Sequence, residues 1–219
     1  MAVWWGIGAL ASVVYLVRFC HAEESYLKSV IKTASIAALS VGAVLAGGPW
    51  ALVAALAVSA LGDWLISRDS QLAFKLGVAS FAAGHLLYVC LFLSHPLAVP
   101  ERLYLHPAPW VIMLLGVLGA LVAVQLFPRA GNLRWPVMAY IPIILSMGAV
   151  ALVLPATGRL VWAKIGAGVF ILSDLVLAQE LFVLSDASRL QKVAPYVVWS
   201  TYWIAQACLT YAFLPTGFA

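Results

Sequence analysis

Apolar residues fill eight long runs of this chain, and polar residues gather in the short segments between them. Each run is roughly 17 to 25 residues long, the length that a helix needs to cross about 30 Å of hydrocarbon. The pattern predicts an all-α polytopic membrane protein, with about eight transmembrane helices in one bundle and residues 1–219 as a single domain. We place the helices near residues 2–20, 27–46, 49–67, 72–94, 108–127, 134–154, 159–184 and 193–214.

The polar segments predict how the helices connect and which way they run. Most are short, as in Arg68-Asp69-Ser70, so consecutive helices should pack as antiparallel neighbours. The longest link, residues 95–107, contains three prolines, and we expect an ordered cap or a flexible lid there. Nine of the twelve Lys and Arg residues flank the first, third, fifth and seventh links. Because basic loops stay in the cytoplasm, both termini should be non-cytoplasmic, in a bacterial inner membrane or a eukaryotic internal membrane.

Composition supports the membrane assignment and narrows the partners. Hydrophobic residues make up 65% of the chain and charged residues 9%, which leaves too few polar groups to cover a soluble domain. The net charge of +4 is spread over short links, so we expect membrane lipids and no nucleic acid as partners. Cys20, Cys90 and Cys208 lie singly in apolar segments and are interpreted as small hydrophobic residues. Zinc-protease, P-loop, serine-hydrolase and dinucleotide-binding motifs are missing from the sequence, and we expect no cofactor.

Two aspartates interrupt the apolar runs and are the best functional candidates. Asp63 and Asp174 each have no basic residue within four positions. An ionised carboxylate in hydrocarbon is costly unless it is paired, hydrated or protonated, so such acids usually face a bundle interior or a water-filled cavity. By helix rise, Asp63 lies about 8 Å and Asp174 about 15 Å from the cytoplasmic boundary. Their helices run in the same direction about half a chain apart, which hints at a four-plus-four helix repeat.

Further polar side chains on the predicted helices are candidates for the same site. His85 lies on the fourth helix and Tyr140 opens the sixth, whereas Tyr202 and Gln206 share a face of the eighth and would line one cavity. The alternative for each is a structural role as a packing seam, an interfacial anchor or an interhelical hydrogen bond. Lys28, at the cytoplasmic end of the second helix, would bind a lipid phosphate or snorkel to the interface.

Two other charged residues are assigned to the membrane interface. Lys32 follows Lys28 by one helical turn and is expected to snorkel. Glu180 is about 240° around the seventh helix from Asp174 and lies near the end of that helix.

Four motifs fall in order on the predicted helices: Leu61–Leu65, Phe81–Tyr88, Phe170–Ala178 and Tyr202–Gln206. In order and spacing they resemble the YhhN family, which includes the animal TMEM86 lysoplasmalogenases. The resemblance runs from about residue 28 to residue 206, and Tyr140 followed by Met147 reinforces it. It departs at Ser29, where many relatives have proline, and this weakens the assignment of Lys28.

The resemblance implies an eight-helix membrane hydrolase that acts on lysoplasmalogen, a single-chain ether lysophospholipid. Cleavage of the vinyl ether bond gives a fatty aldehyde and glycerophosphocholine or glycerophosphoethanolamine. The resemblance also implies that Asp63 and Asp174 are the catalytic pair.

Acid chemistry fits that implied activity. Protonation of a vinyl ether at its β-carbon gives an oxocarbenium ion that water captures, so the enzyme needs one protonated and one ionised carboxyl group. Two buried aspartates can divide these roles. By depth we assign Asp174 as the proton donor and Asp63 as the base, with the reverse left open. His85 and Gln206 would orient the acids or water, and Tyr140 or Tyr202 would hold the glycerol oxygens.

Other function classes stay open at this point. Asp63, Asp174 and His85 together would offer a metal two oxygens and one nitrogen, as in a metal-dependent hydrolase. A hydrolase of epoxides or other ether lipids would share the chemistry of protonation and water attack. A proton-coupled small-molecule transporter also uses buried acids, and a non-catalytic lipid-binding protein would tolerate the loss of both aspartates.

Overall fold

The computed structural model describes residues 2–185 and 187–215, and within these ranges all regular secondary structure is helical. The prediction of an all-α polytopic membrane protein is confirmed, since six of the helical segments are long and apolar enough to cross a membrane. The eight α-helices are α1 (Ala2–Val14), α2 (Tyr26–Leu45), α3 (Trp50–Ile66), α4 (Gln71–Leu93), α5 (Ala108–Leu126), α6 (Arg134–Val150), α7 (Val161–Phe182) and α8 (Arg189–Phe213).

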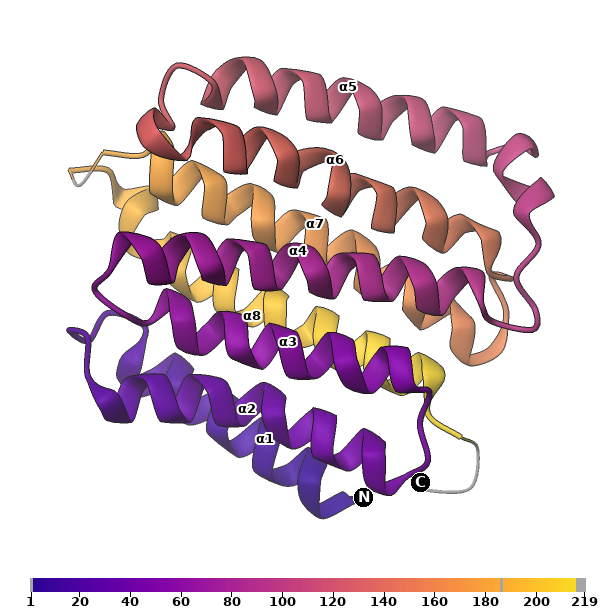
Figure 1. Cartoon of the computed structure of the whole chain (residues 1–219), viewed down its shortest axis with the longest axis horizontal. Coiled ribbons are helices and arrows are strands. Elements are labelled where there is room, and N and C mark those ends of the chain that lie inside the picture. The colour runs from indigo at the N-terminus through magenta and orange to yellow at the C-terminus, as the bar shows by residue number, and fades with distance from the viewer. Residues whose placement is uncertain (1, 186, 216–219) are drawn as a thin grey trace.

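The helices lie side by side along the long axis of the molecule, and consecutive helices are antiparallel (Figure 1). Helix α5 forms one edge, where it packs on α6, and α1 and α2 form the other edge. Between the edges, α3 and α4 pack together in front of α7 and α8, which are themselves extensively packed on each other. Residues from α2, α3, α4, α6, α7 and α8 therefore meet in the interior of the bundle.

Short helical segments finish several of the spans. Helix α1 continues into a π-helical turn, η1 (Tyr15–Phe19), and α6 continues into a 3-10 turn, η4 (Ala151–Val153). The long link after α4 contains the 3-10 helix η2 (Pro100–Tyr104), and Arg102 Nη1 donates a hydrogen bond of 2.7 Å to the Val153 carbonyl. Of the two forms expected for this link, the structure shows the ordered cap.

Close packing of α3 on α4 depends on glycine. A Cβ atom added to Gly62 would lie 2.9 Å from Phe81 Cε2, and one added to Gly77 would lie 2.6 Å from Ile66 Cγ1. Both distances are too short for real contacts, so a larger residue at either position would require Phe81 or Ile66 to move. The glycines thereby hold α4 beside the last turn of α3, where Asp63 lies.

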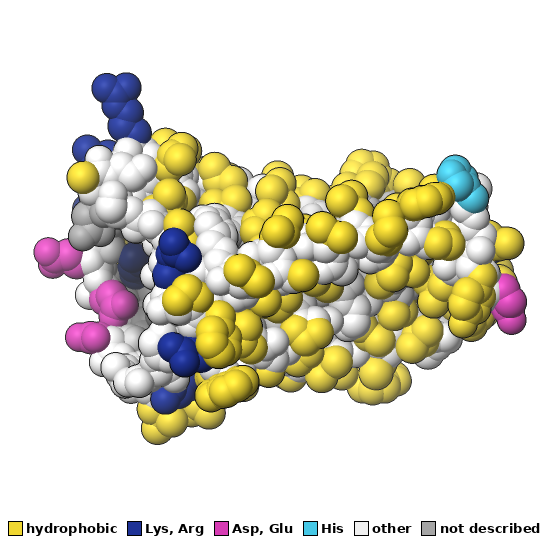
Figure 2. Space-filling model, turned by 90° about the horizontal axis from the view of Figure 1, so that it is seen from above, with side chains coloured by type: hydrophobic (Ala, Val, Ile, Leu, Met, Phe, Trp, Pro, Cys, Tyr) yellow, Lys and Arg dark blue, Asp and Glu magenta, His cyan; other side chains and the backbone are white. Residues whose placement is uncertain are grey.

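Charged side chains are concentrated at one end of the bundle. Figure 2 shows Lys and Arg gathered at the end that carries the first, third, fifth and seventh links, hydrophobic side chains along the length of the visible face, and histidine and acidic side chains at the opposite end. Three of the helices that start there have serine N-caps: Ser25 for α2, Ser70 for α4 and Ser188 for α8. We call this end the basic end. The expected non-cytoplasmic C-terminus falls on residues 216–219, and residue 1 begins the chain; these lie outside the described residues.

Candidate active site

Asp63 is buried in the last turn of α3, near the basic end. Its side chain is 1% exposed. Asp63 Oδ2 accepts a hydrogen bond of 2.8 Å from the Tyr202 hydroxyl of α8, and Asp63 Oδ1 lies 3.5 Å from Lys32 Nζ of α2. Both carboxylate oxygens are therefore engaged by side chains from other helices, which is what a carboxylate in a membrane interior requires.

The position of Lys32 corrects the sequence interpretation. The side chain was expected to snorkel, but it turns inward and is 17% exposed. Its Nζ atom lies 5.8 Å from the ring centroid of Tyr15 and 5.9 Å from that of Trp199. The ion pair with Asp63 and the aromatic rings together compensate the buried ammonium group.

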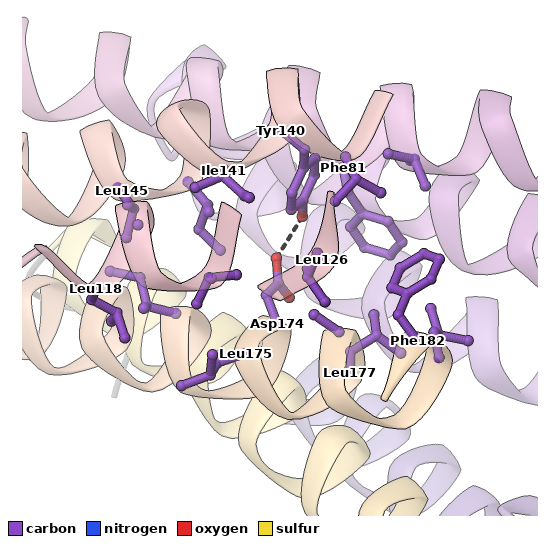
Figure 3. A pocket seen from close by; sticks show the side chains of 18 of the residues that line it. Phe81, Leu118, Leu126, Tyr140, Ile141, Leu145, Asp174, Leu175, Leu177 and Phe182 are labelled. Atoms are coloured by element: carbon purple, nitrogen blue, oxygen red, sulfur yellow. Dashed lines mark hydrogen bonds between the residues drawn. The ribbon is translucent and has the colours of Figure 1, made fainter. Parts of the chain in front are cut away.

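Asp174 forms a second cluster on α7. The Tyr140 hydroxyl of α6 donates a hydrogen bond of 2.5 Å to Asp174 Oδ2 (Figure 3). His85 Nε2, from α4, lies 2.7 Å from the Tyr140 hydroxyl and 3.4 Å from the same Asp174 oxygen. The structure therefore joins three of the residues selected from the sequence. The Asp174 side chain is 15% exposed, so it is more accessible than Asp63.

Aromatic rings lie between the Asp63 cluster and the Asp174 cluster and pack against residues of both. Phe170 of α7 contacts the His85 ring edge-on at 4.6 Å and the Tyr202 ring at 5.4 Å between centroids. Phe81 of α4 also packs edge-on against the Tyr202 ring, at 5.7 Å between centroids. The Tyr202 hydroxyl thus donates a hydrogen bond to Asp63, while the Tyr202 ring packs against Phe170, which also contacts His85 of the Asp174 cluster.

Both aspartates line one cavity of about 240 Å³. We call it the polar cavity, because its wall also contains four charged side chains near the basic end: Glu24, Lys28, Lys32 and Glu180. Glu180, which was assigned to the interface near the end of α7, is part of this wall.

A second space, which is apolar, begins at the carboxyl group of Asp174. This apolar groove of about 150 Å³ lies among α4, α5, α6 and α7 and is lined mainly by aliphatic and phenylalanine side chains (Figure 3). Asp174, Tyr140 and Phe81 line both the polar cavity and the apolar groove. Asp174 therefore lies at the boundary between the polar cavity and the apolar groove. Separately, Gln125 of α5 and Gln179 of α7 link their helices through two reciprocal amide hydrogen bonds of 2.9 and 3.1 Å.

Gln206 and Lys28, two further predicted site residues, differ in their relation to the polar cavity. Gln206 is fully buried and its Oε1 accepts a hydrogen bond from the Tyr88 hydroxyl at 2.5 Å. Among the described residues, the lining of the polar cavity includes Tyr202 and not Gln206. One turn of helix places Gln206 deeper than Tyr202. Lys28 does line the cavity, and its Nζ donates to the Ala22 carbonyl at 2.6 Å.

A three-residue metal site does not form from the candidates. Among the described residues, no group of three or more His, Cys, Asp and Glu side chains is arranged to hold a metal ion. Asp63 lies with Lys32 and Tyr202, apart from the His85 and Asp174 pair. An ammonium group beside one of the carboxylates is a poor environment for a further cation.

The chain is similar to several named proteins. The sequence model described as the YhhN family matches residues 27–213. A lysoplasmalogenase of Mycobacterium tuberculosis (strain CDC 1551 / Oshkosh) is 32% identical over 168 residues, which are 74% of this chain and 59% of that protein. Lysoplasmalogenase TMEM86B of Rattus norvegicus is 33% identical over 205 residues, which are 91% of this chain and 78% of that protein. Lysoplasmalogenase TMEM86B of Sus scrofa is 32% identical over 209 residues, 91% of this chain and 80% of that protein.

The matched regions set the limits of the comparison. The aligned part spans 59% of the length of the mycobacterial relative. No solved structure shows a significant match to the chain. The family match covers most of the sequence, including both aspartate clusters. This chain therefore belongs to the YhhN family.

Proposed function

We propose that the protein is a lysoplasmalogenase-type ether hydrolase. The substrate would be a single-chain ether lysophospholipid, and the products a fatty aldehyde and glycerophosphocholine or glycerophosphoethanolamine. One observation carries the proposal: Asp174 and Tyr140 line both a polar cavity and an apolar groove. A vinyl ether bond lies at the same kind of boundary, between a polar headgroup and a hydrocarbon tail. The names of the relatives support the same activity.

The proton donor in this proposal is Asp174. Within the described parts of the chain, hydrogen bonds from side chains reach its Oδ2 atom only, which leaves Oδ1 available to carry a proton toward the substrate. When that proton moves to the β-carbon of the vinyl ether, Asp174 becomes a carboxylate. The Tyr140 hydroxyl already donates to it and stabilises the new charge.

The ionised partner is Asp63, which takes a proton from the attacking water. Water adds to the oxocarbenium carbon and gives a hemiacetal, while Asp63 becomes protonated. Collapse of the hemiacetal then returns the proton of Asp63 to the departing glycerol oxygen and the hydroxyl proton to Asp174. Both carboxyl groups recover their starting states, so the cycle consumes one water molecule and needs no other reactant.

The two compartments also give the substrate an orientation. The headgroup would occupy the polar cavity, where Lys28 can approach its phosphate, and the alkenyl chain would occupy the apolar groove. Since basic loops favour the cytoplasmic side, we place the basic end and the headgroup at the cytoplasmic leaflet. Both termini would then be non-cytoplasmic.

The test is release of fatty aldehyde from lysoplasmalogen by the purified protein in detergent. We expect turnover of the vinyl ether substrate and none of the ester-linked lysolipid with the same headgroup and chain length. Ester cleavage, or no turnover of either lipid, would contradict the proposal. Turnover that stops with a chelator and returns with zinc would favour the metal-dependent alternative. Proton-coupled uptake by liposomes without turnover would favour a transporter.

A further inference from the structure

We infer that Lys32 is a positioning residue that holds Asp63 as a carboxylate and so decides which of the two aspartates donates the proton. The inference rests on the proposed function and adds a residue that the two-aspartate mechanism does not contain. Lys32 touches neither the reacting bond nor Asp174 in this scheme; it acts through Asp63.

The contact between Lys32 and Asp63 lies in the wall of the polar cavity, which both residues line. Lys32 Nζ lies 3.5 Å from Asp63 Oδ1, and the Asp63 side chain is 1% exposed. The rings of Tyr15 and Trp199 cover the ammonium group, and Tyr202 occupies the other carboxylate oxygen. In a buried ion pair each charge stabilises the other, and removal of one partner leaves a costly unpaired charge.

The two aspartates therefore have partners of different chemical kinds. Asp63 has an ammonium group within ion-pair distance, whereas the nearest groups to Asp174 Oδ2 are a phenol and an imidazole. The other ionisable groups that line the polar cavity come from η1, the α1–α2 link, α2, α6, α7 and α8: Tyr15, Cys20, Glu24, Lys28, Tyr140, Glu180 and Tyr202. Among the described side chains, Lys32 is the lysine that pairs with a catalytic candidate, whereas His85, beside Asp174, carries a charge only when it is protonated. This asymmetry assigns Asp63 as the base and leaves Asp174 as the acid.

The pH dependence of turnover separates this role from a structural one. Activity needs Asp63 ionised, which sets the acidic limb of a bell-shaped profile, and Asp174 protonated, which sets the alkaline limb. In Lys32→Met the carboxylate of Asp63 loses its counter-charge and binds a proton more readily. The acidic limb should therefore move to higher pH, with the alkaline limb in place. Near neutral pH we expect turnover to fall by about 10²-fold, because the base is then mostly protonated.

Matched variants make the result specific. Lys32→Arg keeps a cation at the same position and should restore the wild-type acidic limb and most of the turnover. Lys192→Met removes an exposed lysine of α8 and should leave the profile unchanged. A shift of the alkaline limb in Lys32→Met would overturn the inference, because it would make Asp63 the acid. An unshifted profile would also overturn it and reduce Lys32 to a packing residue.

A second measurement does not depend on turnover. Infrared spectra of the purified protein near neutral pH should show an additional protonated carboxyl band in Lys32→Met, from Asp63, that the wild type and Lys32→Met/Asp63→Asn lack; the band of protonated Asp174 should be present in all three proteins. The double variant removes both charges and so avoids an unpaired buried charge if Lys32→Met alone folds poorly. If the wild type releases no aldehyde but the band behaves as described, the proposed function fails while the Lys32 assignment stands. If the wild type is active and the band is missing from Lys32→Met, the Lys32 inference fails alone.

Discussion

Tyr140→Phe tests the acid end of the site by removing a single oxygen atom. That oxygen donates a 2.5 Å hydrogen bond to Asp174 and lies 2.7 Å from His85 Nε2. A hydrogen bond to a charged acceptor contributes about 1.5 to 3 kcal/mol. The bond gains its full strength when Asp174 becomes ionised in the transition state, so kcat should fall by about 10- to 150-fold.

The same change should leave substrate binding nearly intact. The phenyl ring of Phe preserves the lining of the polar cavity and the apolar groove, so KM should change by less than about threefold. The alkaline limb of the pH profile should move to higher pH, because the carboxylate of Asp174 loses a donor. This is the opposite limb from the one that Lys32→Met should move.

The assay is steady-state aldehyde release from lysoplasmalogen, with kcat and KM measured separately across pH. Tyr104→Phe is the matched control, because Tyr104 is 83% exposed and should behave like wild type. Size-exclusion profiles and thermal unfolding establish that each variant is folded. A folded Tyr140→Phe protein with wild-type kcat, or with a changed KM alone, would refute the reasoning and leave Tyr140 as a lining residue.

Three further predictions concern the carboxyl groups, the groove and the topology. Asp63→Asn and Asp174→Asn should each lower turnover by about 10²- to 10⁴-fold in folded protein, and near-normal turnover would remove that aspartate from the mechanism. Ala178→Trp should fill part of the apolar groove, so kcat/KM measured by aldehyde release should fall more for long alkenyl chains than for short ones; equal losses would place the tail elsewhere. In a cysteine-free background, a cysteine at Ser70 should be labelled by an impermeant maleimide from the cytoplasmic side and one at Thr157 from the other side, and the reverse pattern would invert the orientation.

The fold was predictable to the level of its helices. Apolar runs of membrane-spanning length and short polar links gave the number and order of helices within a few residues. The rotation of each helix was harder, because apolar residues cover most faces of these helices and periodicity then carries little information. Only polar residues report the inward face, which is why Asp63, Asp174 and His85 were found.

The partners of those residues depend on packing between helices that are distant in sequence. Asp63 has no basic residue within four positions, yet Lys32 reaches it from α2. Tyr202 and Gln206 lie on one face of α8, but one turn separates a hydrogen bond to Asp63 from one to Tyr88. Such differences of a few ångströms are set by tertiary contacts such as the close approach at Gly62, and no local pattern in the sequence records them.

The boundary at Asp174 has a consequence for product release. A fatty aldehyde condenses readily with amines to form a Schiff base, so an enzyme that makes one risks modifying its own lysines. Lys28 and Lys32 lie on the side of the polar cavity, while the described residues that line the apolar groove include no lysine. For a vinyl ether hydrolase, cleavage at this boundary would send the glycerophospho product toward water and the aldehyde sideways into the bilayer. The aldehyde would then leave without passing Lys32, the amine that is proposed to keep Asp63 ionised.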